Sequence, residues 1–313
     1  MTQLLSTPDR EEADFIVADI VSTFSKPFRS PVIGRPSDLG LKYEDITFPS
    51  LDGVPLEGWF IPCEGSDKLV ICNHPLWFSR TGLPAHLEPW KSIGGAAGND
   101  FEVNFLADYK ILHDAGYSVL AYDLRNFGHS GAANGGIGSV GIFEARDVVG
   151  SLIYARTHPS LKNMKVGLFS RCMGCNATFF AMQKYPEYFK NVCCMIAPQP
   201  ISMRMAMTRA LKLVGLLDRI DEIEEKIFLV TSLRLDDMDP REPAKHNHVP
   251  TFMYQVHDDL LTVPSNVQEI FDNMPVKEKQ LHWIRNTTRR WDGYLYFQRE
   301  PQLMLSWLAK YMQ

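Results

Sequence analysis

Short apolar runs and amphipathic stretches alternate along most of the chain. From residue 43 onward the apolar runs are rich in β-branched and aromatic residues, and amphipathic stretches of helical period separate the later ones. The predicted strands include residues 117–123, 164–169, 192–197, 251–256 and 280–284, and the predicted helices include 101–116, 142–157 and 176–186. Alternating units of this length are typical of the α/β class, with a mostly parallel sheet covered by helices on both faces.

The alternation is interrupted once, which suggests the domain organisation. Residues 1–40 are expected to form an N-terminal helical extension, and residues 41–197 and 250–313 to form two parts of one core. Residues 198–249 between them carry a Met-rich amphipathic stretch and an acidic one, and we expect an inserted helical lid there. The methionines of this segment suit ordinary helix packing and a flexible substrate-facing surface equally well.

Composition excludes several function classes. The chain has 313 residues, of which 45% are apolar and 22% charged, as in an ordinary globular protein. Its net charge of −5 gives no basic surplus for nucleic acid. No signal peptide or membrane-spanning run is evident, so we expect a cytoplasmic protein with no membrane partner and six free thiols. The partner expected is a small-molecule substrate, no metal or other cofactor is expected, and a homodimer is compatible with the sequence.

The most specific local signal is the stretch VGLFSRCMGCNA, residues 166–177. An apolar strand leads into a tight turn, small residues stand two before and two after Cys172, and a helix begins at once. A nucleophile at such a turn needs small neighbours, and the helix N-terminus below it favours a thiolate or a developing oxyanion. A buried structural cysteine at a strand–helix junction is the alternative interpretation.

This stretch resembles the nucleophile elbow of the α/β-hydrolase fold, with Ser170-Arg171-Cys172-Met173-Gly174 in place of Gly-x-Ser-x-Gly. The resemblance extends from about residue 43 to 312. Residues 123–131, DLRNFGHSG, look like the loop after the fourth strand of these hydrolases, and residues 73–76, NHPL, look like their oxyanion loop. The resemblance implies Cys172 as nucleophile and the N–H groups of Leu76 and Met173 as the oxyanion hole. His74, Arg171 and Trp77 beside them are expected to line the substrate site.

The same resemblance places an acid after the strand at residues 251–256. Counting from Pro250 selects Asp259, with Asp258 as the alternative. Where the family has its histidine, this sequence has Arg289, with Arg290 beside it. An arginine cannot act as a base at neutral pH, but a guanidinium near a cysteine favours the thiolate. The base would then come from elsewhere, and His74, His129 and His257 are the candidates.

These features predict an enzyme that acts on a small ester, lactone or thioester through a cysteine nucleophile, most simply a hydrolase. A lyase, cyclase or isomerase on the same fold would use the oxyanion hole and Arg289 without water. A ligand-binding protein with a decayed triad is the third interpretation, and the reactivity of Cys172 distinguishes it from the two enzymes.

Overall fold

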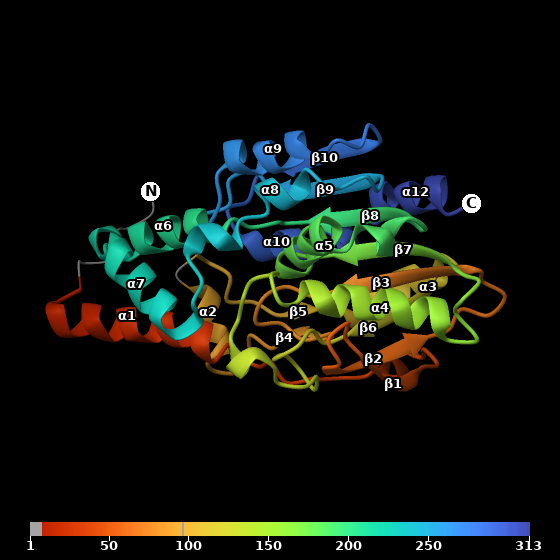
Figure 1. Ribbon diagram of the computed structural model, residues 1–313, viewed down its shortest axis with the longest axis horizontal. Helices are drawn as coiled ribbons and strands as arrows, with labels where there is room; N and C mark the ends of the chain where they lie inside the picture. Colours follow the sequence, from red (N-terminus) through yellow and green to blue (C-terminus); the bar gives the residue numbers. More distant parts are fainter. Residues whose placement is uncertain (1–7, 96) are drawn as a thin grey trace.

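The computed structural model describes residues 8–95 and 97–313. Its centre is an eight-stranded sheet in the order β1-β2-β6-β3-β7-β8-β9-β10 (Figure 1). β1 and β2 pair antiparallel with each other, β2 pairs antiparallel with β6, and every later pair is parallel. The strands are β1 Glu44–Pro49, β2 Pro55–Ile61, β3 Lys68–Asn73, β6 Ser118–Tyr122, β7 Lys165–Ser170, β8 Val192–Pro198, β9 Thr251–Val256 and β10 Lys279–Ile284. The predicted α/β class with a mostly parallel sheet is therefore confirmed.

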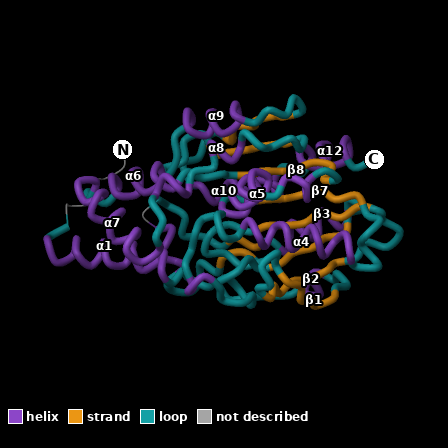
Figure 2. The backbone as a smooth tube through the Cα atoms, in the orientation of Figure 1, coloured by secondary structure: helices purple, strands orange, loops and turns teal. Residues whose placement is uncertain are grey.

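Helices cover both faces of this sheet (Figure 2). One row consists of α4 Ala145–Thr157, α5 Met173–Lys184, α8 Arg241–Ala244 and α9 Pro264–Asn273, each in contact with the next. The other layer contains α3 Leu106–Asp114, α11 Tyr296–Arg299 and α12 Gln302–Tyr311. The central strands are buried along their length because both faces are covered, which explains their continuous apolar runs. None of the helices in the described residues is both long and apolar enough to cross a membrane.

A cluster of helices lies at the carboxyl end of the strands. It consists of α1 Arg10–Ser25, α6 Met203–Leu213 and α7 Ile220–Thr231, which lie together on one side of the molecule (Figure 1). Only four residues separate the end of β8 from α6, so this cluster stands at the edge of the sheet where active-site loops of such folds gather. Residues 1–7 of the predicted N-terminal extension lie outside the described residues.

The N-terminal helix and the predicted lid form one packed unit. α1 begins with a capping box between Asp9 and Glu12 and packs against α7. Arg219 lies in the segment that joins α6 to α7. Its Nη2 lies 2.7 Å from Oδ1 of Asp14 in α1, and the two form an ion pair. The N-terminal helix therefore packs against part of the segment that the sequence predicts as a lid.

Short elements complete the chain. A two-stranded ribbon joins β4 Gly82–Leu83 to β5 Val103–Asn104, and helix α2 Trp90–Gly95 lies between them. The five-residue helix α10 Arg290–Tyr294 follows β10 and packs against β9. The sequence pattern does not predict α10 as a helix, and this short element carries Arg290 and Tyr294, which lie in the candidate site.

Candidate active site

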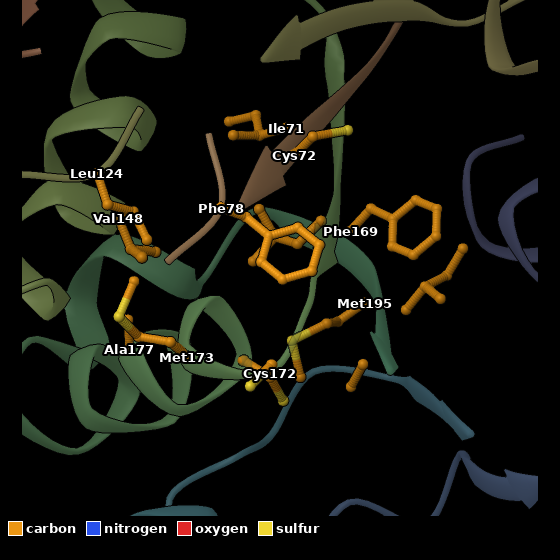
Figure 3. Packing of buried hydrophobic residues seen from close by; sticks show 14 of the residues in the cluster. Ile71, Cys72, Phe78, Leu124, Val148, Phe169, Cys172, Met173, Ala177 and Met195 are labelled. Atoms are coloured by element: carbon orange, nitrogen blue, oxygen red, sulfur yellow. The ribbon is translucent and has the colours of Figure 1, made fainter. Parts of the chain in front are cut away.

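Cys172 occupies a strained turn between β7 and α5. Its φ of 51° and ψ of −113° lie where non-glycine residues are rare, and it is the N-cap of α5. Its N–H donates to the carbonyl of Pro198 at 2.9 Å, which ties the turn to the end of β8. Figure 3 shows Cys172 at the beginning of α5 among apolar side chains that include Met173 and Met195. The strand–turn–helix predicted from the sequence is present.

Packing explains the small residues on either side of Cys172. A Cβ on Gly174 would lie 2.7 Å from Cβ of Asn73 and 2.9 Å from its carbonyl carbon, so only glycine fits. The hydroxyl of Ser170 accepts hydrogen bonds from Asn73 Nδ2 at 2.8 Å and from Thr178 Oγ1 at 2.9 Å. The end of β3, the turn and α5 are therefore held together beneath Cys172.

Two backbone N–H groups near this turn have no hydrogen-bond partner among the described residues. They belong to Met173, the first residue of α5, and to Leu76, which follows β3. β3 and β7 are adjacent parallel strands in register at Asn73 and Ser170, so the two N–H groups start from the same edge of the sheet. Such unpaired donors beside a nucleophile could stabilise an oxyanion.

Asp259 lies in the buried interior of the site, with a relative exposure of 1%. Its carboxylate accepts hydrogen bonds from the N–H of Leu261 at 2.9 Å, from Thr262 Oγ1 at 3.1 Å and from Gln255 Nε2 at 3.3 Å. Asp258 is instead exposed and lies 2.7 Å from Nδ1 of His257. The geometry therefore favours Asp259 over Asp258.

Arg290, and not Arg289, is the partner of Asp259, so the predicted assignment of Arg289 is corrected. Arg290 Nη1 lies 2.7 Å from Asp259 Oδ2, and both side chains are almost fully buried. The side chain of Arg289 is half exposed, pairs with Asp292 at 2.9 Å and lies over the ring of Phe101. Arg289 is the N-cap of α10 and Arg290 its first residue, and the one-residue step turns the two side chains in different directions.

Sequence reasoning missed two further residues of the site, Tyr294 and Gln199. The Tyr294 hydroxyl accepts a hydrogen bond from Arg290 Nε at 3.1 Å. The backbone carbonyl of Gln199 accepts a hydrogen bond from Arg290 Nη2. The side-chain Nε2 of Gln199 donates one to the backbone carbonyl of Arg290. Tyr294 stands four residues after Arg290, a helical spacing that would have identified it once Arg290 was chosen.

Electrostatic interactions connect Arg290 and Tyr294 to Cys172. Burial by itself would lower the pKa of Arg290, but Tyr294, Cys172 and Asp259 raise it well above its usual value, so the guanidinium stays charged. Burial raises the pKa of Tyr294 well above its usual value, and contact with Cys172 acts in the same direction while Arg290 opposes it. The site thus contains a fixed cation and a neutral phenol beside the thiol.

The three residues expected to line the substrate site, Arg171, Trp77 and His74, lie in different surroundings. Arg171 is buried, pairs with Asp108 at 2.5 Å and lies over the ring of Phe169, so its expected role in substrate binding is corrected to a role in packing. Burial raises the pKa of Asp108 to about 6 although Arg171 opposes this. Trp77 is half-buried with a φ of 68°, and its indole N–H has no partner among the residues that the structure describes.

His74 holds the loop after β3 in place. Its Nδ1 lies 2.7 Å from the carbonyl of Pro75, and its Nε2 accepts from the N–H of Leu124 at 3.0 Å. Burial lowers its pKa, so the ring is neutral, with the proton on Nδ1. Both ring nitrogens are therefore used by the backbone, and neither is left to bond a substrate.

The other histidines considered as bases also have partners elsewhere. His129 Nδ1 lies 3.4 Å from Arg80 Nη2, and His257 packs edge-on against Trp283. No histidine forms a hydrogen bond with the Cys172 side chain within residues 8–95 and 97–313. Across the same ranges, no three His, Cys, Asp or Glu side chains are grouped as a metal site.

Comparison with solved structures identifies the architecture. An esterase from Pyrococcus furiosus, Pf2001, superimposes with a TM-score of 0.66 and 21% identity over 91% of this chain and 98% of that chain. The chain has the α/β-hydrolase fold. The α/β hydrolase GrgF from a Penicillium species gives a TM-score of 0.57 with 18% identity, covering 87% and 99% of the two chains. A dienelactone hydrolase from Anabaena variabilis gives 0.54 with 16% identity, covering 87% and 99%.

No protein-family model matches the sequence, and no curated protein does either. In this α/β-hydrolase fold Cys172 follows the fifth strand of the sheet in spatial order, at the usual position of the nucleophile. Asp259 follows β9, and Arg290 follows the last strand, β10.

Proposed function

We propose that this chain is a hydrolase of small acyl compounds (esters, lactones or thioesters) with Cys172 as its nucleophile. The observation that carries the proposal is the position of Cys172 at a strained elbow beside the buried Arg290–Asp259 pair. The Cys172 N–H donates to the carbonyl of Pro198 at 2.9 Å, and Arg290 donates to the carbonyl of the next residue, Gln199. Strain at a residue other than glycine persists only where the surrounding structure enforces it, and such positions concentrate at active sites. The fold of the esterase and hydrolase structures above supports the same reaction class.

Each residue has a defined task in this mechanism. Cys172 Sγ attacks the carbonyl carbon, and the N–H groups of Leu76 and Met173 stabilise the negative oxygen of the tetrahedral intermediate. The leaving group departs, and the acyl group stays on Cys172 until water hydrolyses it. Arg290 supplies a permanent positive charge beside the sulfur, and Asp259 holds that arginine in position.

Substrate entry requires a conformational change in this mechanism. Cys172 has a relative exposure of only 4%, so a substrate reaches its sulfur when a covering segment moves. We assign this movement to the 198–249 insertion. Arg209 of α6 donates from Nε to the carbonyl of Leu260 at 3.0 Å, directly beside Asp259. Opening of α6 would therefore break this hydrogen bond and disturb the loop that carries Asp259.

Hydrogen exchange tests the lid assignment. In the free protein we expect α6 and α7 to exchange faster than the central strands β3 and β7, because a lid opens locally without global unfolding. A covalent inhibitor on Cys172 should slow exchange in both helices. Exchange of α6 as slow as that of β7, unchanged by the inhibitor, would exclude a moving lid.

Substitution at Cys172 tests the nucleophile. Cys172→Ala and Cys172→Ser should each lower kcat/KM on para-nitrophenyl butyrate and on a butyryl thioester by about 10³-fold or more, since a serine hydroxyl is a much weaker acid than a thiol and no histidine of the described residues bonds this side chain to take its proton. Cys175→Ala is the matched control, because Cys175 is buried one helical turn away. Mass spectrometry of quenched wild-type protein should find a butyryl group on Cys172. Full activity of Cys172→Ala would refute the proposal.

A further inference from the structure

The chemistry of Cys172 leaves one proton without an assigned route. The thiol must lose a proton when it attacks, and an alkoxide leaving group must gain one. Arginine cannot carry this proton at neutral pH, and the nitrogens of His74 are used by the backbone. A group that both accepts and donates a proton is needed beside Cys172.

Tyr294 has the required properties. Its hydroxyl accepts from Arg290 Nε at 3.1 Å, and Arg290 Nη2 donates to the backbone carbonyl of Gln199. The carbonyl of the preceding residue, Pro198, accepts from the Cys172 N–H at 2.9 Å, so Tyr294 and Cys172 come together at the carboxyl end of β8. Cys172 also raises the pKa of Tyr294, in the same direction as burial. The bond from Arg290 Nε uses one lone pair of the Tyr294 oxygen, so its second lone pair and its own O–H remain available. The ring is fixed, because it is 2% exposed and packs edge-on against Phe78 with 5.2 Å between centroids.

We propose that the Tyr294 hydroxyl relays the proton between the Cys172 sulfur and the leaving group, in place of a histidine. This inference rests on the proposed function. In acylation the sulfur bonds to the carbonyl carbon, the thiol proton passes to Tyr294 Oη, and the proton of Tyr294 passes to the departing alkoxide as the C–O bond breaks. In deacylation water attacks the thioester, a water proton passes to Oη, and the proton of Tyr294 passes to the sulfur as the C–S bond breaks.

The electrostatics of the site favour such a concerted relay. Burial opposes ionisation of Tyr294, so a free tyrosinate is avoided and the hydroxyl regains a proton as it gives one up. The N–H from Arg290 withdraws electron density from Oη and strengthens the O–H as a donor. Asp259 and the carbonyl of Gln199 hold Arg290 in position for this bond.

Leaving-group dependence gives the decisive experiment. Para-nitrophenolate departs as a stable anion, whereas ethoxide needs a proton as it leaves. For Tyr294→Phe we expect kcat/KM on ethyl butyrate to fall by about 10²- to 10⁴-fold, the usual range for general acid–base catalysis. The loss on para-nitrophenyl butyrate should be smaller by about tenfold or more. Tyr254→Phe is the matched control, because the Tyr254 hydroxyl is buried and has no hydrogen-bond partner in the described part of the chain.

The wild-type protein provides a second measurement that needs no variant. The solvent deuterium isotope effect on kcat/KM should be larger for ethyl butyrate than for para-nitrophenyl butyrate, because the relayed proton moves in the first reaction's transition state. Equal losses on the two esters in Tyr294→Phe, or equal isotope effects, would overturn the relay. If Cys172→Ala is inactive while Tyr294→Phe is unimpaired, the relay fails and the proposed function stands. If Cys172→Ala is fully active, the proposed function itself fails.

Discussion

The Arg290–Asp259 ion pair is the feature of this site whose removal has the most predictable cost. We consider Arg290→Met, which keeps a long side chain and removes the charge. Asp259 would then remain as a buried carboxylate without its cation. Breaking a buried pair from one side costs about 3–5 kcal/mol of unfolding free energy. Asp259 keeps its hydrogen bonds from Leu261, Thr262 and Gln255, so we expect the lower end, about 3 kcal/mol.

The neighbouring arginine provides a matched control. The side chain of Arg289 is half exposed, and its partner Asp292 also accepts hydrogen bonds from Thr287 and Arg299. Exposed pairs contribute about 0–1 kcal/mol, so Arg289→Met should cost no more than about 1 kcal/mol. Two identical substitutions one residue apart should therefore differ in cost by at least about threefold, a ratio that follows from these two ranges.

Urea unfolding at neutral pH measures both costs. The transition midpoint should fall much further for Arg290→Met than for Arg289→Met, with the slope m unchanged in both. The double variant Arg290→Met, Asp259→Leu should cost less than the two single changes added together, because it leaves no unpaired buried charge. If the two single arginine variants differ by less than about 1 kcal/mol, Arg290 is not the buried partner and the assignment of the site is wrong.

Two other substitutions test the elbow and the edge of the sheet. Gly174→Ala should destabilise the protein by about 1–3 kcal/mol, because its Cβ would overlap Asn73. Gly95→Ala should not, because no atom of the described residues lies within 4 Å of the Cβ that it would add. Thermal unfolding that ranks the two variants alike would contradict this packing. Asp52 has its pKa lowered to about 2: burial opposes the shift, but hydrogen bonds and charge from Arg125 and other neighbours outweigh it. Its folded pKa lies below the unfolded value, so its stabilisation is present above about pH 4 and is lost as the pH falls toward 2. Asp52→Asn should flatten the dependence of Tm on pH in that window, and a curve parallel to that of the wild type would contradict the assignment.

The fold class and the elbow could be predicted from the sequence because both depend on local rules. A parallel sheet needs crossover helices, and this requirement gives the alternation of apolar runs with amphipathic stretches. The turn at Cys172 needs small residues two positions away on either side, since Asn73 and its hydrogen bonds fill the space around Ser170 and Gly174. Such requirements are imposed within a few residues of the chain and can be recognised there.

The identity of the buried arginine was decided only by the tertiary structure. Arg289 and Arg290 are the same residue type at adjacent positions, and successive residues at the start of a helix point in different directions. The point where α10 begins therefore selects the one that faces Asp259. That point depends on long-range contacts, such as the hydrogen bond from the N–H of Trp291 to Asn99 Oδ1 at 3.0 Å.

The same reason explains why Arg171 was misassigned and Tyr294 was missed. Arg171 is adjacent to the nucleophile in sequence, but its partner Asp108 stands 63 residues away and lies on α3 in another layer of the fold. Tyr294 comes near Cys172 because the segment after the last strand forms α10, which packs against β9 and is bonded through Arg290 to the end of β8. The sequence alone thus determined which residue stands at the elbow, through steric needs that act locally. Which charges and hydroxyl groups surround its sulfur was decided by packing between segments that are distant in the chain.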